Sequence, residues 1–166
     1  MTAPGVAIAR PDRIARVVFV AALVTNTGQS GIDSIPDDRR PSYFEMARDS
    51  GDNSFLPSFE AAWDRFFPSA TESQARDFYA RLTPQPLGPY LEPSPAGADA
   101  LIDIGVPCSY VLLDQDRTFP PAIARTFAER VGINAVEEPG DHCWMLTDPE
   151  GCASGISRIA HLTDRR

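Results

Sequence analysis

Apolar residues gather along this chain in three short runs that predict β-strands. Residues 17–24 (VVFVAALV) are continuously apolar, and residues 109–113 (SYVLL) are rich in strand-forming side chains. A shorter run covers residues 133–138. Continuous apolar runs, unlike alternating ones, are typical of strands buried on both faces of a parallel sheet. The pattern therefore predicts a small parallel sheet.

Helical patterns surround these runs. Residues 1–10 predict a first helix. Between Pro120 and Gly132, apolar residues recur at helical spacing, with proline at the start and glycine at the end. Asp148 is placed to cap a last helix whose first position is Pro149. Strands that alternate with helices predict the α/β fold class, with three parallel strands and flanking helices.

Residues 29–95 have a different texture, with many prolines and glycines between short helical patterns. Ser42 with Glu45, and Thr71 with Gln74, form capping-box patterns that predict the starts of two helices. This pattern therefore predicts that residues 29–95 form a helical insert between two strands of the sheet. We expect it to form a cap, or lid, over a pocket.

Four aromatic residues of this insert fall on one helical stripe. Its members are Phe59, Trp63, Phe66 and Phe67. Aromatic stripes more often belong to a core than to a ligand site, yet we expect Phe59 or Trp63 to bind substrate under the cap. The chain then divides into residues 1–28, the first helix and strand of the core, residues 29–95, the cap, and residues 96–166, the remaining core.

The composition is that of an ordinary globular protein. The chain has 166 residues, of which 43% are hydrophobic and 23% charged, which is enough for one domain with its own core. A formal net charge of −8 argues against a nucleic-acid partner, because phosphate binding needs a basic surface. No apolar run reaches membrane-spanning length, and no glycine-rich phosphate-binding motif supports a nucleotide cofactor. We expect no cofactor, metal or membrane partner.

The three cysteines indicate the compartment. Cys108, Cys143 and Cys152 are an odd number without metal-ligand spacing, which fits reduced thiols in the cytoplasm. Cys143 follows His142 directly, but neighbours on a strand-to-helix loop usually point in different directions. A thiol nucleophile is therefore not the favoured interpretation.

Two polar residues follow predicted strands where a common edge is expected. Asp116 comes just after residues 109–113, and His142 comes just after the third strand. Because the carboxyl ends of parallel strands share one edge, where ligands bind, we expect these side chains to lie together. Asp114 is the alternative acid, but it lies nearer the body of the strand.

A carboxylate beside an imidazole is the acid–base part of a catalytic triad. The carboxylate accepts a hydrogen bond from one ring nitrogen, so that the other nitrogen takes a proton from the nucleophile. The alternative is an exposed turn aspartate and a solvent-facing loop histidine, but the position of His142 at a strand end favours the functional interpretation. The second histidine, His161, is predicted to be a surface residue near the end of the last helix.

The order of these motifs resembles the α/β-hydrolase family, whose triad runs nucleophile, acid, histidine along the chain. Residues 10–20 look like the helix exit and strand that follow the nucleophile, and residues 140–150 look like the histidine loop. Residues 28–30, 81–87, 106–107 and 114–116 resemble the branch that contains salicylate-type methyl esterases and hydroxynitrile lyases. The resemblance implies a small ester substrate, with Asp116 and His142 as the catalytic acid and base.

The nucleophile motif of this family is absent from the sequence. The family carries a serine on a G-x-S-x-G elbow, with an oxyanion hole partly from an earlier loop. Residues 28–31 (GQSG) follow the wrong strand, and residues 151–155 (GCASG) come after His142. The chain is therefore expected to be a truncated hydrolase, namely the C-terminal half, which carries the acid and the histidine without the nucleophile or the oxyanion hole and is inactive alone.

Two functions remain open at this point. The first is hydrolysis of small esters by a full hydrolase to which this chain contributes the acid and the histidine. The second is a repurposed or non-catalytic small-molecule-binding remnant, or a lyase- or cyclase-like reaction with His142 as base. In a half hydrolase, the strand at residues 17–24 loses a neighbour on one side, which predicts a homodimer or an N-terminal-half partner there.

Overall fold

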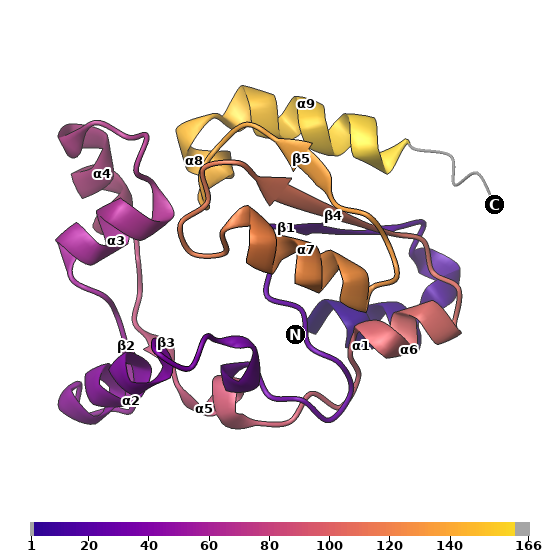
Figure 1. Ribbon diagram of the computed structural model, residues 1–166, viewed down its shortest axis with the longest axis horizontal. Coiled ribbons are helices and arrows are strands. Elements are labelled where there is room, and N and C mark those ends of the chain that lie inside the picture. Colours follow the sequence, from indigo (N-terminus) through magenta and orange to yellow (C-terminus); the bar gives the residue numbers. More distant parts are fainter. Residues whose placement is uncertain (1, 162–166) are drawn as a thin grey trace.

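The computed structural model of the protein describes residues 2–161 as a parallel sheet with helices on both faces (Figure 1). The strands are β1 (Val17–Val20), β4 (Cys108–Leu113) and β5 (Val136–Glu138), in the order β1-β4-β5. Both pairings are parallel, and Val111 of β4 is in register with Val20 on one side and Val136 on the other. The predicted α/β fold with three parallel strands is confirmed.

Strand β4 lies in the middle of the sheet and is buried on both faces. Tyr110 and Leu112 pack on one face and Val111 and Leu113 on the other, and all four are fully buried. The first face is covered by α1 (Thr2–Ala9), α6 (Ala98–Asp103) and α7 (Pro121–Arg130), and the second by α8 (Trp144–Thr147) and α9 (Pro149–Ala160). This double burial explains why the strand is continuously apolar in sequence.

Strand β1 is shorter than predicted. Of the run at residues 17–24, the strand that pairs with β4 covers Val17–Val20 and ends there. It ends because Ala21 adopts a φ of 43° and turns the chain out of the sheet. The loop that follows stays attached to the core, since the Ala22 carbonyl accepts a hydrogen bond from the Tyr110 hydroxyl at 2.7 Å. An apolar run can therefore continue beyond the strand that it predicts.

Strand β5 starts later than predicted. It covers Val136–Glu138 rather than residues 133–138. The chain leaves α7 through Gly132, whose φ of 71° suits glycine, and then Ile133 and Ala135 pack against the core beside α7. Ile133 and Ala135 are therefore apolar because they pack against the core beside α7, and not because they belong to the strand.

The segment at residues 29–95, called the insert, lies between β1 and β4 and contains elements of its own. These are η2 (Ile32–Ser34), α2 (Arg40–Asp49), β2 (Ser54–Phe55), α3 (Phe59–Phe66), α4 (Glu72–Tyr79), β3 (Gln85–Pro86) and α5 (Gly88–Leu91). Two hydrophobic clusters support it, one around Tyr43 and Phe55 and one between α3 and α4 around Phe67. In Figure 1 the insert occupies the end of the molecule toward which β4 points.

Two predicted helix starts are confirmed by their hydrogen bonds. Thr71 and Gln74 form a complete capping box on α4, in which Thr71 Oγ1 accepts from Gln74 N at 3.4 Å and Gln74 Oε1 accepts from Thr71 N at 3.0 Å. Asp148 caps α9 by accepting from Gly151 N at 3.0 Å. Short polar side chains at these positions replace hydrogen bonds that a helix start cannot form within itself.

The capping box predicted for Ser42 and Glu45 is wrong. Helix α2 begins earlier, at Arg40, with Pro41 in its first turn. Ser42 lies inside the helix, and its hydroxyl donates to the Arg39 carbonyl at 2.8 Å. The proline, rather than the serine, marks where this helix starts.

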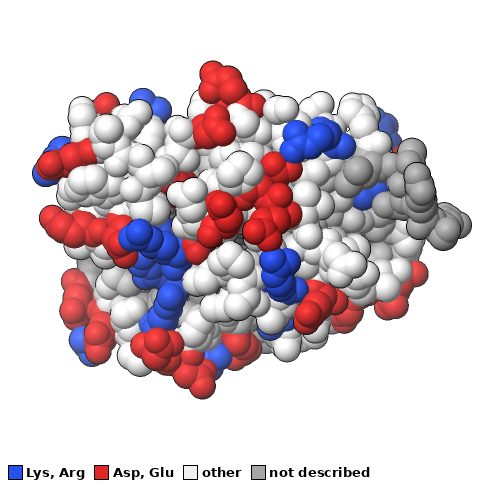
Figure 2. Space-filling model, turned by 45° about the horizontal axis from the view of Figure 1, so that its top comes forward, with Lys and Arg blue, Asp and Glu red and all other residues white. Residues whose placement is uncertain are grey.

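The surface carries both signs of charge. On the face shown in Figure 2, basic side chains are scattered among acidic ones and do not merge into one basic patch. His161 is exposed at the end of α9, as predicted. Between residues 2 and 161, no helix is long and apolar enough to cross a membrane.

The central place of β4 leads to a stability prediction. Leu112→Ala should lower the free energy of unfolding by about 2–5 kcal/mol, because it leaves a cavity in a fully buried strand. The control Ile102→Ala, at a side chain that is 51% exposed, should change it by less than about 0.5 kcal/mol. Urea denaturation followed by circular dichroism measures both, and equal effects would contradict the assigned core.

Candidate active site

Strands β4 and β5 bring two loops together at the carboxyl end of the sheet. The acid loop, residues 114–120, follows β4, and the histidine loop, residues 139–143, follows β5. Gln115 N donates to the Gly140 carbonyl at 2.9 Å, and Gly140 N donates to Asp114 Oδ1 at 2.9 Å. The first bond extends the backbone pairing beyond the strands, the second ties Gly140 to a side chain of the acid loop, and together they keep the two loops adjacent.

Asp116 and His142 meet between these loops, as predicted. His142 Nδ1 lies 3.0 Å from Asp116 Oδ2. Because an ionised carboxylate only accepts hydrogen bonds, Nδ1 is the donor and Nε2 is left as the acceptor. The Asp116 side chain is 1% exposed and the His142 side chain 21%, so the imidazole reaches solvent while the carboxylate is buried.

Backbone amides hold the Asp116 carboxylate in place. Its Oδ1 accepts from Thr118 N at 2.7 Å and from Phe119 N at 2.9 Å. These bonds compensate the burial of the charge and aim the other oxygen at the imidazole. Asp114, the alternative acid, is exposed and accepts from Gly140 N instead, so it helps to place the histidine loop.

Two phenylalanines flank the imidazole. The ring centroids of Phe66 and Phe119 each lie 5.6 Å from that of His142, with interplanar angles of 32° and 71°. Phe119 comes from the acid loop, whereas Phe66 comes from α3 of the insert. The insert therefore supplies one wall of the site.

Phe59 and Trp63, the predicted substrate-binding residues, lie within the cluster between α3 and α4. Phe59 packs on Trp63 and on Tyr79, and Trp63 Nε1 donates to the Ala70 carbonyl at 3.1 Å. Their role in substrate binding stays a prediction. Phe66, the next aromatic residue of the stripe on the same helix, is the one that contacts His142. Helical periodicity alone does not predict which aromatic residue of the stripe reaches the histidine.

The carboxyl end of α3 is hydrogen-bonded to both loops of the site. Cys143 N donates to the Phe66 carbonyl at 2.8 Å, and Thr118 Oγ1 donates to the Arg65 carbonyl at 3.1 Å. These carbonyls belong to the last turn of the helix, which has no partners of its own for them. The two loops thus supply hydrogen-bond donors for the carbonyls at the end of α3, and the same bonds hold both loops in place.

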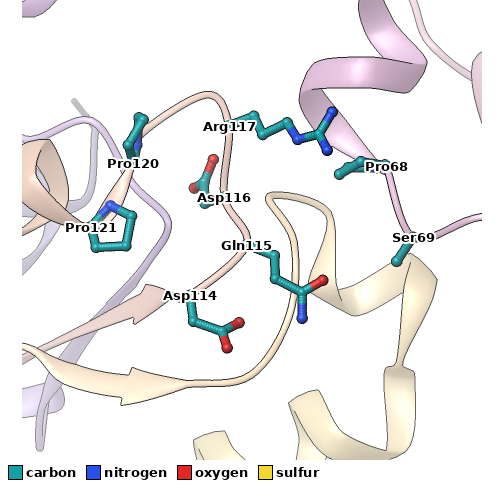
Figure 3. A pocket seen from close by; sticks show the side chains of 8 residues that line it. All are labelled: Pro68, Ser69, Asp114, Gln115, Asp116, Arg117, Pro120 and Pro121. Carbon is teal, nitrogen blue, oxygen red and sulfur yellow. The ribbon is translucent and has the colours of Figure 1, made fainter.

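A pocket of about 500 Å³ lies between the acid loop and the turn that joins α3 to α4 (Figure 3). It is lined by Pro68, Ser69, Asp114, Gln115, Asp116, Arg117, Pro120 and Pro121. Its volume is in the range of small-molecule pockets. In the part of the chain that the structure describes, no group of three or more His, Cys, Asp or Glu residues is placed to hold a metal ion.

The Cys143 thiol is not prepared for nucleophilic attack. Burial raises its pKa, and the nearby carboxylates of Asp141 and Asp116 raise it further, to about 12. The thiolate, and not the thiol, is the nucleophilic form. The structure therefore supports the interpretation that Cys143 is not a catalytic nucleophile.

The family of the chain follows from comparison with known proteins. The model of the alpha/beta hydrolase family matches residues 2–154. The chain belongs to the α/β-hydrolase family. None of the curated proteins matches the sequence.

Several solved structures share the fold. An extracellular α/β-hydrolase from a Paenibacillus species, described as a structural and functional homologue of tobacco salicylic acid binding protein 2, is 27% identical with a TM-score of 0.88, over 96% of this chain and 67% of that one. A pyrethroid hydrolase from Sphingobium faniae is 17% identical with a TM-score of 0.69, over 97% and 66% of the two chains. Polyneuridine aldehyde esterase is 16% identical with a TM-score of 0.60, over 96% and 68%. The last two comparisons show the fold alone, and the chain spans about two thirds of the length of each structure.

The raised pKa of Cys143 leads to a prediction about its reactivity. At about pH 8, iodoacetamide should modify Cys143 about a thousandfold more slowly in the folded protein than in urea, because a thiol with a pKa of about 12 is almost fully protonated. The rate should rise about tenfold for each pH unit, as long as the pH stays below that pKa. Peptide mass spectrometry follows the modification, and equal rates in the two states would contradict the environment described.

Proposed function

We propose that this chain carries the acid and the base of a serine hydrolase that acts on small esters. Asp116 orients His142, and His142 takes the proton of a serine nucleophile and then returns it to the leaving group. The contact of 3.0 Å between these two side chains, at the carboxyl edge of an α/β-hydrolase sheet, carries the proposal.

The surroundings of His142 support small, aromatic or cyclic esters as the substrate class. Phe66, which is half-buried, offers part of its ring beside the imidazole and suits a flat apolar group, while the buried Phe119 supports the imidazole from the core. The Paenibacillus hydrolase is described as a homologue of a salicylic acid binding protein, whose ligand is a small aromatic acid. The insert acts as the cap over this substrate in the proposal.

The nucleophile is the missing part of the reaction. The sequence contains no G-x-S-x-G motif, so we expect this chain alone to hydrolyse esters no faster than background. A serine and an oxyanion hole would have to come from a segment outside these 166 residues. That segment would join the sheet beside β1, which pairs on one side only among residues 2–161.

The outer edge of β1 offers backbone groups for such a partner. Val17 N donates to the Pro107 carbonyl at 2.9 Å, and Ala21 N donates to the Val111 carbonyl at 3.0 Å. Because donors alternate along a parallel strand, the amide of Val18 points to the opposite edge. We propose that a strand of an N-terminal hydrolase half, which would also bring the serine, pairs there. Without that half, a strand of a second copy would cover the same edge but would bring no G-x-S-x-G motif.

An esterase assay tests the proposed chemistry. Hydrolysis of p-nitrophenyl acetate by this chain should equal that of His142→Ala, since the sequence has no serine in a G-x-S-x-G elbow for the base to activate. Addition of the N-terminal third of the Paenibacillus hydrolase as a separate polypeptide should raise the rate, and His142→Ala should then lower it by about 100-fold or more.

His161→Ala is the matched control for this assay and should leave the restored rate unchanged, because His161 is exposed at the end of α9. Strong turnover by the chain alone that is lost in His142→Ala would refute the need for a partner. It would favour a reaction in which His142 acts as a base without serine.

A proline substitution tests the proposed edge. Val18→Pro removes an amide that points away from β4, so it should weaken association at this edge while the fold is kept. Phe19→Pro, one residue along, removes an amide that points toward β4 and should unfold the protein. Size-exclusion chromatography measures the association, and a wild-type chain that stays monomeric at high concentration, without any strand partner, would refute the self-association.

A further inference from the structure

Asp141 is a fully buried carboxylate next to His142 that the proposed reaction does not use. Its Oδ2 accepts from Ser69 Oγ at 2.6 Å and from Ser69 N at 3.3 Å, and its Oδ1 accepts from Thr147 Oγ1 at 2.9 Å. All of these donors are neutral groups. Burial of a carboxylate without a cation is costly even when it is hydrogen-bonded, so packing alone does not explain an aspartate here.

Asp141 connects the histidine loop with the insert. Ser69 lies in the turn between α3 and α4 (Figure 3), so its two bonds to Asp141 cross from the insert to the core. On the other side of His142, Cys143 N donates to the Phe66 carbonyl at 2.8 Å. The residues before and after His142 are therefore both hydrogen-bonded to the insert.

We infer that Asp141 is a positioning residue, which fastens the histidine loop to the Ser69 turn and so keeps the His142 imidazole against Asp116. The inference rests on the proposed function, because it concerns the same imidazole. The contact between His142 and Asp116 is a single hydrogen bond of 3.0 Å, which a small shift of the loop would break. A displacement of about 1 Å at a catalytic group is enough to reduce a rate strongly.

NMR spectroscopy of the two histidines tests the inference, and a His161→Gln variant assigns their signals. The readout is the proton on His142 Nδ1, both its presence and its rate of exchange with water. Asp116→Asn should abolish this signal. The amides of Thr118 and Phe119 hold the amide oxygen of the new side chain, so its NH₂ group faces Nδ1 and favours the other tautomer.

Two variants then weaken the connection itself. Ser69→Ala removes one bond to Asp141 without a change in the histidine loop, and Asp141→Asn keeps the shape of the side chain. In both, the proton on His142 Nδ1 should exchange about tenfold faster than in the wild type. The control Asp64→Asn removes the exposed ion pair between Asp64 and Arg117, which also joins the insert to the acid loop, and should leave the exchange rate unchanged.

The outcomes separate this inference from the proposed function. A signal that persists in Asp116→Asn would refute the acid–histidine pair, and with it both proposals. A signal that Asp116→Asn abolishes, but that exchanges at the wild-type rate in folded Ser69→Ala and Asp141→Asn, would refute the inference alone. Faster exchange in these two variants, with Ser69→Ala still folded in a cooperative urea denaturation and with an unchanged control, supports the positioning role.

Discussion

The parallel pairing of β4 with β5 is the constraint on which the candidate site depends. Leu113 pairs with Glu138, and the loops that carry Asp116 and His142 begin within a few residues of this pair. A slip of one residue would turn every side chain of a strand to the other face of the sheet. In β4 such a slip would exchange Tyr110 and Leu112 with Val111 and Leu113 between two differently packed faces of the core. The packing of the core therefore sets the register, and with it the distance between Asp116 and His142.

Much of this arrangement could be predicted from the sequence, because its signals are local. The apolar run of β4, the capping residue Thr71 and the order of Asp116 and His142 each act over a few neighbouring residues, and each lies where its pattern indicates. The end of β1 could not be predicted, since it depends on a positive φ at Ala21. Alanine rarely adopts that conformation and gives no turn signal.

The contacts between the insert and the candidate site could not be predicted from the sequence, for a different reason. Which aromatic of α3 reaches His142 depends on how the end of the helix meets the loops, and the small β2–β3 sheet pairs segments far apart in sequence. Neither contact has a periodicity of its own. The hydrogen bond between Ser69 and Asp141 could not be predicted either, because the sequence does not indicate which turn lies close enough to bind this aspartate. All three contacts depend on the tertiary structure, which residue propensities do not describe.

The groups that hold the acid–histidine pair all lie in the described chain, on the β4 and β5 side of the sheet. They are the amides of the acid loop, the hydrogen bonds between the two loops and the end of α3. Among residues 2–161, β1 and β5 each pair on one side only, and the outer edge of β1 lies on the side of β4 away from β5. A strand that brought a serine to this edge would therefore complete the sheet and the triad together, without a change in the groups that already orient His142. For this reason an ordered acid and base are compatible with a sequence that contains no G-x-S-x-G motif.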